Sequence, residues 1–205
     1  MTPIPHDAIS SVQKSYIICS TGRSGSSLLS KTLSKPQNCG NPEEYFHPKE
    51  LTPRLTSSDE NAFTNYYLAV IQQGTSPNGV FGLKIHWHHF KEFLKIARQQ
   101  MPTLADATDI EIIQQLFPNP KFIHIARQDT LQQAVSTCVA HQTKIWSKSQ
   151  RTHSQTPLHR PRFAPLDIYR YKVGIEAHNR AWERFFAKHA IQSHKIVYEE
   201  LVNAY

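Results

Sequence analysis

The segment Ser-Thr-Gly-Arg-Ser-Gly-Ser-Ser-Leu-Leu at residues 20–29 follows an apolar strand at residues 16–19 and opens a predicted helix at Ser26. Backbone N–H groups at a helix start, together with the helix dipole, favour a bound anion. The glycines let the backbone approach that anion closely, and Arg23 adds a fixed positive charge. Residues 20–27, the anion loop below, therefore predict a phosphate or sulfate site. The alternative is an ordinary tight turn, because short Gly/Ser clusters mark turns generally.

The anion loop differs from an ATP-binding P-loop, which requires Gly-Lys followed by Ser or Thr. Here Ser26 follows Gly25, and the positive charge lies before that glycine, at Arg23. Magnesium-dependent phosphoryl transfer is thus disfavoured. A P-loop kinase of small molecules remains the weakest of the open alternatives.

The composition narrows the class of protein. We expect one domain over residues 1–205, which is long enough to bury a sizeable core. The net charge of +7 favours anionic partners, but Lys and Arg are spread out, which argues against nucleic acid. Three widely spaced cysteines do not suggest a disulfide framework. Since no apolar run reaches the length of a membrane span or resembles a signal peptide, we expect a soluble cytoplasmic protein.

Predicted strands and helices alternate along the chain. Strands are expected at residues 16–19, 79–87, 121–126 and 195–198, and helices at residues 26–33, 88–99, 110–117, from about 129 and from 167 to about 190. This order is typical of an α/β protein with a central parallel sheet flanked by helices. Ligands of such sheets bind beyond the carboxyl ends of the strands, where the anion loop and Arg127 both fall.

Two polar segments, residues 38–58 and 147–165, are expected to be loops. The second is basic and poor in hydrophobic residues, so a surface loop is the simpler interpretation. A lid over an anionic ligand is the alternative.

Four blocks, in order, make the chain resemble a known family. They are the anion loop, Pro-Glu-Glu-Tyr-Phe at residues 42–46, Gly-Leu-Lys-Ile-His-Trp at 82–87, and Ile-Ala-Arg-Gln-Asp-Thr-Leu-Gln-Gln-Ala-Val-Ser at 125–136, the last followed by His-Gln-Thr-Lys-Ile-Trp at 141–146. Together they resemble the trehalose 2-sulfotransferase family, bacterial carbohydrate sulfotransferases that use 3′-phosphoadenosine 5′-phosphosulfate (PAPS). The resemblance implies a P-loop-like sulfotransferase fold and sulfonyl transfer from PAPS to a hydroxyl of a carbohydrate or glycolipid.

The resemblance also implies roles for individual residues. The positions that match the family's loop for binding the 5′-phosphosulfate are Arg23, Ser24, Gly25, Ser26 and Ser27. Arg127 and Ser136 match the pair that holds the 3′-phosphate, and Glu44 matches the proposed catalytic base. A block near the active site, with a weaker assignment to the substrate, is matched by Gln142, Thr143 and Trp146.

The residues themselves agree with two of these roles. Arg127 follows a strand and Ser136 lies about two turns into the next helix, so one phosphate could meet both. The alternative is a surface salt bridge and an unrelated helix serine. Glu44 lies among aromatic residues, and we expect partial burial to raise its pKa, as suits a general base. The alternative is a solvated loop glutamate.

Lys84 interrupts the apolar strand at residues 79–87, and a charge inside a buried strand is costly unless paired. We expect Lys84 to face the site and to steady negative charge there. The alternative places Lys84 in solvent at a sheet edge. His86, His88 and His89 lack the spacing of known zinc sites, so no metal is expected.

The family usually continues beyond the position where this chain stops, so we expect the C-terminus to be short relative to it. A PAPS-binding or PAP-binding module with impaired catalysis, PAP being the desulfated donor, is therefore the main alternative to an active enzyme. A homodimer is compatible with the resemblance.

Overall fold

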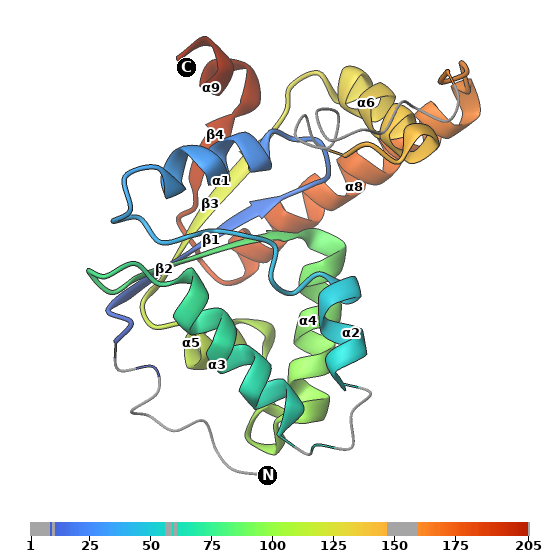
Figure 1. Cartoon of the computed structure of the whole chain (residues 1–205). Helices are drawn as coiled ribbons and strands as arrows, with labels where there is room; N and C mark the ends of the chain where they lie inside the picture. Colours follow the sequence, from blue (N-terminus) through green and yellow to red (C-terminus); the bar gives the residue numbers. More distant parts are fainter. Residues whose placement is uncertain (1–8, 10, 56–58, 60, 147–159, 205) are drawn as a thin grey trace.

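The computed structural model describes residue 9, residues 11–55, residue 59 and residues 61–146 and 160–204. Within these residues, four strands form one parallel sheet in the order β2-β1-β3-β4 (Figure 1). The strands are β1 (Lys14–Ser20), β2 (Val80–His86), β3 (Pro120–Ala126) and β4 (His194–Val197). Ile18 of β1 is paired with Lys84 of β2 and Ile123 of β3. The predicted α/β class with a central parallel sheet is confirmed.

The sheet buries both of its faces. Ile17 and Cys19 point into the main apolar cluster, while Ile18 between them joins a second cluster with Leu29 and Ile125. Successive strand residues face opposite sides of a sheet, so this division follows from the period of two. A strand buried on both faces requires helices on both.

Helices cover each face (Figure 1). The described helical segments are α1 (Ser26–Ser34), α2 (Pro48–Leu55), α3 (Ala62–Gly74), α4 (Trp87–Gln100), η2 (Pro102–Leu104), α5 (Asp109–Leu116), α6 (Thr130–Thr143), α8 (Pro165–Lys188) and α9 (Tyr198–Asn203). Side chains of α1 and α9 pack on the Ile18 face. Those of α3, α4, α5 and the end of α8 pack on the Ile17 face.

Two helices depart from the prediction. The segment at residues 38–58, expected to be a loop, contains α2, which includes Pro53 and buries Leu51 in the core. Helix α3 was not predicted, although Phe63, Tyr67 and Val70 follow helical spacing and are buried. Tertiary burial of one apolar face stabilises such short helices more than their intrinsic propensity does. Of the expected loop at residues 147–165, residues 147–159 lie outside the described part, and α8 begins at Pro165.

Helix α6 begins as predicted, since the Asp129 side chain accepts a hydrogen bond from the Gln132 backbone N–H at 2.8 Å. Ala134 and Cys138 are buried against α8, whereas Leu131 and Val135 are 55% and 39% exposed. Helix α6 therefore buries only part of its apolar side.

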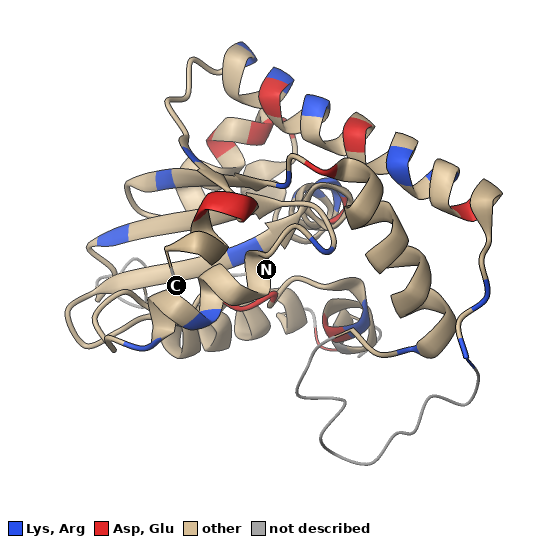
Figure 2. Cartoon of the chain, turned by 90° about the horizontal axis from the view of Figure 1, so that it is seen from above, with Lys and Arg blue, Asp and Glu red and all other residues tan. Residues whose placement is uncertain are grey.

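Figure 2 shows Lys and Arg spread over several strands, helices and loops, with acidic residues interspersed along α8. In the described residues, no helix is both long and apolar enough for a membrane crossing. Cys19, Cys39 and Cys138 are free thiols, as the sequence predicts.

Candidate functional site

The candidate site lies where the carboxyl ends of the four strands meet. Strand β1 continues into the anion loop, β2 ends at His86, β3 is followed by Arg127, and β4 by Tyr198. The predicted position of the anion loop and Arg127, beyond the strand ends, is confirmed.

The anion loop has the conformation that its glycines favour. Gly25 has φ of 90° and caps α1, and Arg23 has φ of 62°. The side chains of Thr21, Ser24 and Ser26 are buried. Ser24 Oγ has no hydrogen-bond partner in the part of the chain that the structure describes. A buried hydroxyl without a partner at a helix N-terminus fits an anionic ligand, because buried polar atoms are otherwise almost always paired.

Helix α6 supports the anion loop from one side. The fully buried amide of Gln133 donates to Thr21 Oγ1 at 2.9 Å and to the Gly22 carbonyl at 2.7 Å. Arg23 Nε donates to Ser136 Oγ at 2.9 Å, and its guanidinium also donates to the Trp146 carbonyl. Ser136, matched by the family resemblance to the 3′-phosphate, thus already contacts the anion loop.

Arg127 lies beside the start of α9. Its Nε is 3.6 Å from Glu199 Oε1, and its guanidinium lies 4.7 Å from the centre of the Tyr198 ring. The Glu199 carboxylate also accepts hydrogen bonds from the Gln128 and Asp129 backbone N–H groups at 3.1 and 3.3 Å. Burial would raise the pKa of Glu199, but these donors and Arg127 lower it. Arg127 and two backbone N–H groups therefore form an anion-binding arrangement that holds the Glu199 carboxylate.

Tyr198 also contacts the anion loop. A Cβ atom at Gly25 would lie 2.3 Å from Cδ2 of the Tyr198 ring. Only glycine fits there, since the positive φ and the ring both oppose a side chain. The anion loop and the start of α9 are thus packed as one unit.

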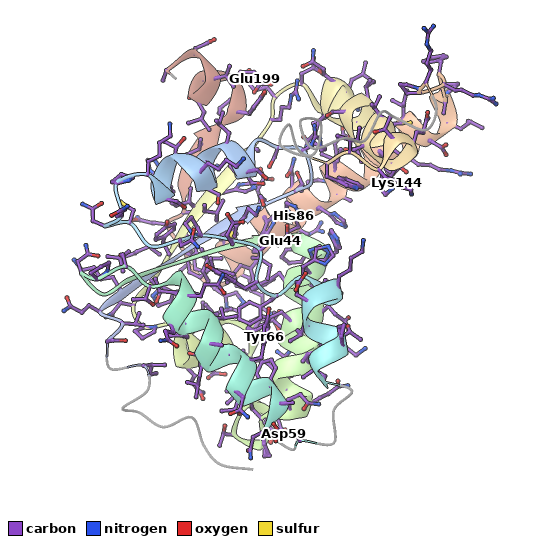
Figure 3. The ribbon with its side chains drawn as sticks, viewed as in Figure 1. Glu44, Asp59, Tyr66, His86, Lys144 and Glu199 are labelled. Carbon is purple, nitrogen blue, oxygen red and sulfur yellow. The ribbon has the colours of Figure 1, made fainter. Side chains whose placement is uncertain are left out.

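The second half of the site is a carboxylate surrounded by imidazoles. Glu44 follows the loop after α1 and accepts a hydrogen bond from His89 Nδ1 at 2.6 Å through Oε1. Its Oε2 is 3.6 Å from His86 Nε2. Glu44 and His86 lie next to each other in Figure 3, well away from Glu199.

The pKa of Glu44 differs in direction from the prediction. Burial does raise it, but the His89 hydrogen bond and the charges of His86, which is protonated at the low pH where Glu44 titrates, and of Lys84 outweigh burial and lower the pKa to about 2. Glu44 is therefore an ionised carboxylate at neutral pH. The sequence analysis counted the apolar neighbours of Glu44 in the chain and missed the polar groups that the fold brings to it.

His86 connects Glu44 to the anion loop. The Ser20 hydroxyl lies 2.9 Å from His86 Nδ1 and donates to the Ile85 carbonyl at 3.3 Å. His86 Nδ1 thus faces the start of the anion loop, and Nε2 faces Glu44. Burial lowers the pKa of His86 to about 4, so the ring is neutral.

Lys84 is only 6% exposed, which favours the expectation of an inward-facing residue over a solvated one. Its backbone N–H donates to the Glu43 carbonyl at 3.0 Å, and this bond fixes the segment that carries Glu44 against β2. Its positive charge contributes to the lowered pKa of Glu44.

The block at residues 141–146 lies at the end of α6. The Gln142 side chain exchanges hydrogen bonds with the backbone of Arg162 at 2.7 and 3.0 Å. Thr143 Oγ1 donates to the Val139 carbonyl at 2.8 Å. The Trp146 ring packs edge-on against His141 at 4.8 Å. Gln142 and Thr143 therefore have local structural bonds, and Trp146 reaches the anion loop through its carbonyl.

Several residues of the site were not predicted from the sequence, namely His47, Gln133, Tyr198 and Glu199, and His86 and His89 were considered only as metal ligands. One signal was available for part of this set. Glu44 and His47 lie three residues apart, and His86 and His89 lie at the end of β2 and in the first turn of α4. Their convergence depends on the pairing of Glu43 with Leu83 of β2, which no local pattern reveals.

Comparison with known proteins agrees with this geometry. The chain is 26% identical over 212 aligned residues to a trehalose 2-sulfotransferase of Mycobacterium tuberculosis (strain ATCC 35801 / TMC 107 / Erdman), a match covering 91% of this chain and 78% of the relative. It is 28% identical to a trehalose 2-sulfotransferase of Mycolicibacterium smegmatis (strain ATCC 700084 / mc(2)155), over 64% of this chain and 58% of that relative. The family model of the Stf0 sulphotransferases matches residues 15–205. The chain therefore belongs to the Stf0 sulphotransferase family and is a sulfotransferase.

Proposed function

We propose that this sulfotransferase transfers a sulfonyl group from PAPS to a hydroxyl of a carbohydrate or glycolipid, with Glu44 as general base. The observation that carries the proposal is the connection Ser20–His86–Glu44, which joins an ionised, largely buried carboxylate to the start of the anion loop. Both relatives are named for transfer to trehalose, so trehalose is the first acceptor to test.

The anion loop would hold the 5′ end of the donor. The residues proposed for this are Arg23, Ser24, Gly25, Ser26 and Ser27. The best-supported contact is the Ser24 hydroxyl, which has no hydrogen-bond partner among the described residues. Arg127 and Ser136 would hold the 3′-phosphate, joined by the backbone N–H groups that now bind Glu199. When bound, PAPS supplies an activated sulfonyl group. Gln142, Thr143 and Trp146 remain weaker candidates for the acceptor side.

Glu44 would take the proton of the acceptor hydroxyl. Its Oε1 is occupied by His89, so Oε2, which faces His86, is the oxygen proposed to receive the proton. A carboxylate with a pKa of about 2 is a weak base towards a free alcohol. It becomes adequate as the acceptor oxygen bonds to sulfur, because that oxygen then grows strongly acidic. Lys84 would stabilise negative charge beside it. The proposed reaction requires no metal.

Thermal unfolding with added nucleotide tests the donor. Adenosine 3′,5′-bisphosphate at about 100 times its Kd stabilises a binding protein by roughly 2.7 kcal/mol. For a chain of this length that corresponds to an increase in Tm of about 5–11 °C. We expect this increase with the bisphosphate and none with ATP and magnesium. The opposite result would favour a small-molecule kinase and refute the proposed donor.

Turnover tests the acceptor and the catalytic competence. The full chain is incubated with PAPS and trehalose, or with a panel of sugars and glycolipids, and the sulfated product is detected by mass spectrometry. We expect formation of product and of adenosine 3′,5′-bisphosphate in equal amounts. Tight binding of the bisphosphate without turnover on any acceptor would instead identify a binding module with impaired catalysis.

A further inference from the structure

The carboxylate of Glu44 is one member of a cluster of metal-ligating side chains. Ligand atoms of Glu44, His47 and His89 all lie within 4.8 Å of one another. The rings of His47 and His89 have their centres 4.3 Å apart. The residues come from two segments, the loop that follows α1 and the first turns of α4. The sequence spacing of His86, His88 and His89 gave no zinc pattern because His47 and Glu44 come from a distant part of the chain.

The donor set has a definite chemical preference. Two imidazoles and one carboxylate suit borderline transition metals such as Zn²⁺, and three protein ligands with an open position are common in zinc sites. Mg²⁺ and Ca²⁺ prefer sets made of oxygen atoms alone. A fourth donor is close by, since His86 Nε2 is 3.6 Å from Glu44 Oε2.

The distances allow a metal with small movements. Zn–N and Zn–O bonds of about 2.0–2.2 Å at a tetrahedral angle place two ligand atoms roughly 3.3 Å apart. The 2.6 Å separation of His89 Nδ1 and Glu44 Oε1 would open by less than about 1 Å, and the others would close by up to about 1.5 Å. The metal would replace the proton shared by His89 and Glu44, and that proton would go to solvent.

We propose that Glu44, His47 and His89 form a binding site for a borderline divalent metal ion such as Zn²⁺, and that the bound ion inhibits sulfonyl transfer. The inhibition rests on the proposed function, because a cation bound at Oε1 withdraws negative charge from the same carboxylate and so weakens Oε2 as the acceptor of the proton from the substrate hydroxyl. Metal binding itself does not depend on that function.

Co²⁺ titration of the full chain, without a polyhistidine tag and without nucleotide, tests the site by visible absorption. We expect one equivalent to bind with the bands of a four- or five-coordinate ion, and Zn²⁺ but not Mg²⁺ to displace it. His47→Ala should weaken binding at least about 10-fold, since loss of even an outer-shell partner of a metal ligand costs that much. His47 is partly exposed, so this change opens no core cavity. His194→Ala, on the exposed start of β4, is the matched control and should bind as the unaltered chain does.

The outcomes separate the two proposals. Absence of one-equivalent Co²⁺ binding, or equal binding by His47→Ala, would overturn the metal site and leave the proposed reaction untouched. Metal binding that leaves turnover unchanged would instead overturn the inhibition and the assignment of Glu44 as the base. Inhibition by Zn²⁺ that a chelator reverses, and that is weaker in His47→Ala, is the expected result.

Discussion

Two glutamates, Glu44 and Glu199, meet cationic or donor groups at the same edge of the sheet, but their surroundings differ. The Glu44 side chain is 19% exposed and is held by the half-buried His86 and the buried His89. The Glu199 side chain is 33% exposed and is held by Arg127 and two backbone N–H groups. Both carboxyl groups have lowered pKa values.

The difference shows that two carboxylates at the same edge of the sheet can have different roles. The groups around Glu44 are fixed by strand ends and core packing, so its carboxylate is a permanent part of the site. The groups around Glu199 are donors that any anion could use, and α9 makes few buried contacts, with no residue of the described helix fully buried. Under the proposed function, Glu44 stays in place during the reaction, whereas Glu199 gives way to the 3′-phosphate.

Replacing Glu44 should produce the largest effect. Glu44→Gln keeps the shape but removes the proton acceptor, so we expect turnover to fall by about 10²–10⁴ and the affinity for adenosine 3′,5′-bisphosphate to stay nearly unchanged. Steady-state rates and calorimetric titration measure the two quantities. Glu43→Gln, at the exposed neighbouring position, is the matched control. Full activity of Glu44→Gln would remove Glu44 from the mechanism.

Replacing Arg127 should affect binding rather than chemistry. Charge-assisted hydrogen bonds contribute about 1.5–3 kcal/mol, so Arg127→Ala should weaken adenosine 3′,5′-bisphosphate roughly 10–100-fold. Binding of adenosine 5′-monophosphate, which lacks the 3′-phosphate, should change little. Arg170→Ala, at a 77% exposed side chain on α8, controls for loss of a positive charge. Equal losses for both nucleotides would contradict the 3′-phosphate assignment.

Adding one methyl group at Gly25 tests the contact between the anion loop and the start of α9. Gly25→Ala meets the Tyr198 ring at 2.3 Å and requires a positive φ, so we expect a loss of about 1–3 kcal/mol in unfolding free energy and weaker bisphosphate binding. Thermal and denaturant unfolding measure the change. Gly22→Ala has open space at its Cβ position and should leave the unfolding free energy nearly unchanged. If Tyr198→Ala restores none of the lost stability in the double variant, the ring is not the cause.

The sequence predicted the framework of the molecule better than its details. The four strands and the edge that carries the site follow from apolar runs and from the rule for parallel sheets. Helix α3 was missed because it lies between polar stretches, although Phe63 and Tyr67 show helical spacing. Val135 lies on the apolar side of α6 but is 39% exposed, since a helix pattern does not reveal how far the neighbouring helix extends.

The candidate site divides in the same way. The conformation of the anion loop at Gly25 is local, and local patterns predict it well. The environment of Glu44 is not local, because His86 and His89 lie more than 40 residues away in the chain and meet it only after Glu43 pairs with Leu83 of β2. The predicted direction of the shift in the pKa of Glu44 was wrong for that reason.

Replacing Glu199 should give the smallest effect and the sharpest test of the contrast between Glu44 and Glu199. In the free protein its carboxylate uses the donors of Arg127, Gln128 and Asp129, and an incoming phosphate must displace it. Glu199→Gln is uncharged and competes less well, so the affinity for adenosine 3′,5′-bisphosphate should increase roughly 2–5-fold, the range expected for an exposed ion pair of 0.3–1 kcal/mol. Glu200→Gln, one residue on and exposed, should leave it unchanged. A decrease in affinity would mean that Glu199 supports the ligand, and the contrast between a fixed and a displaceable carboxylate would then fail.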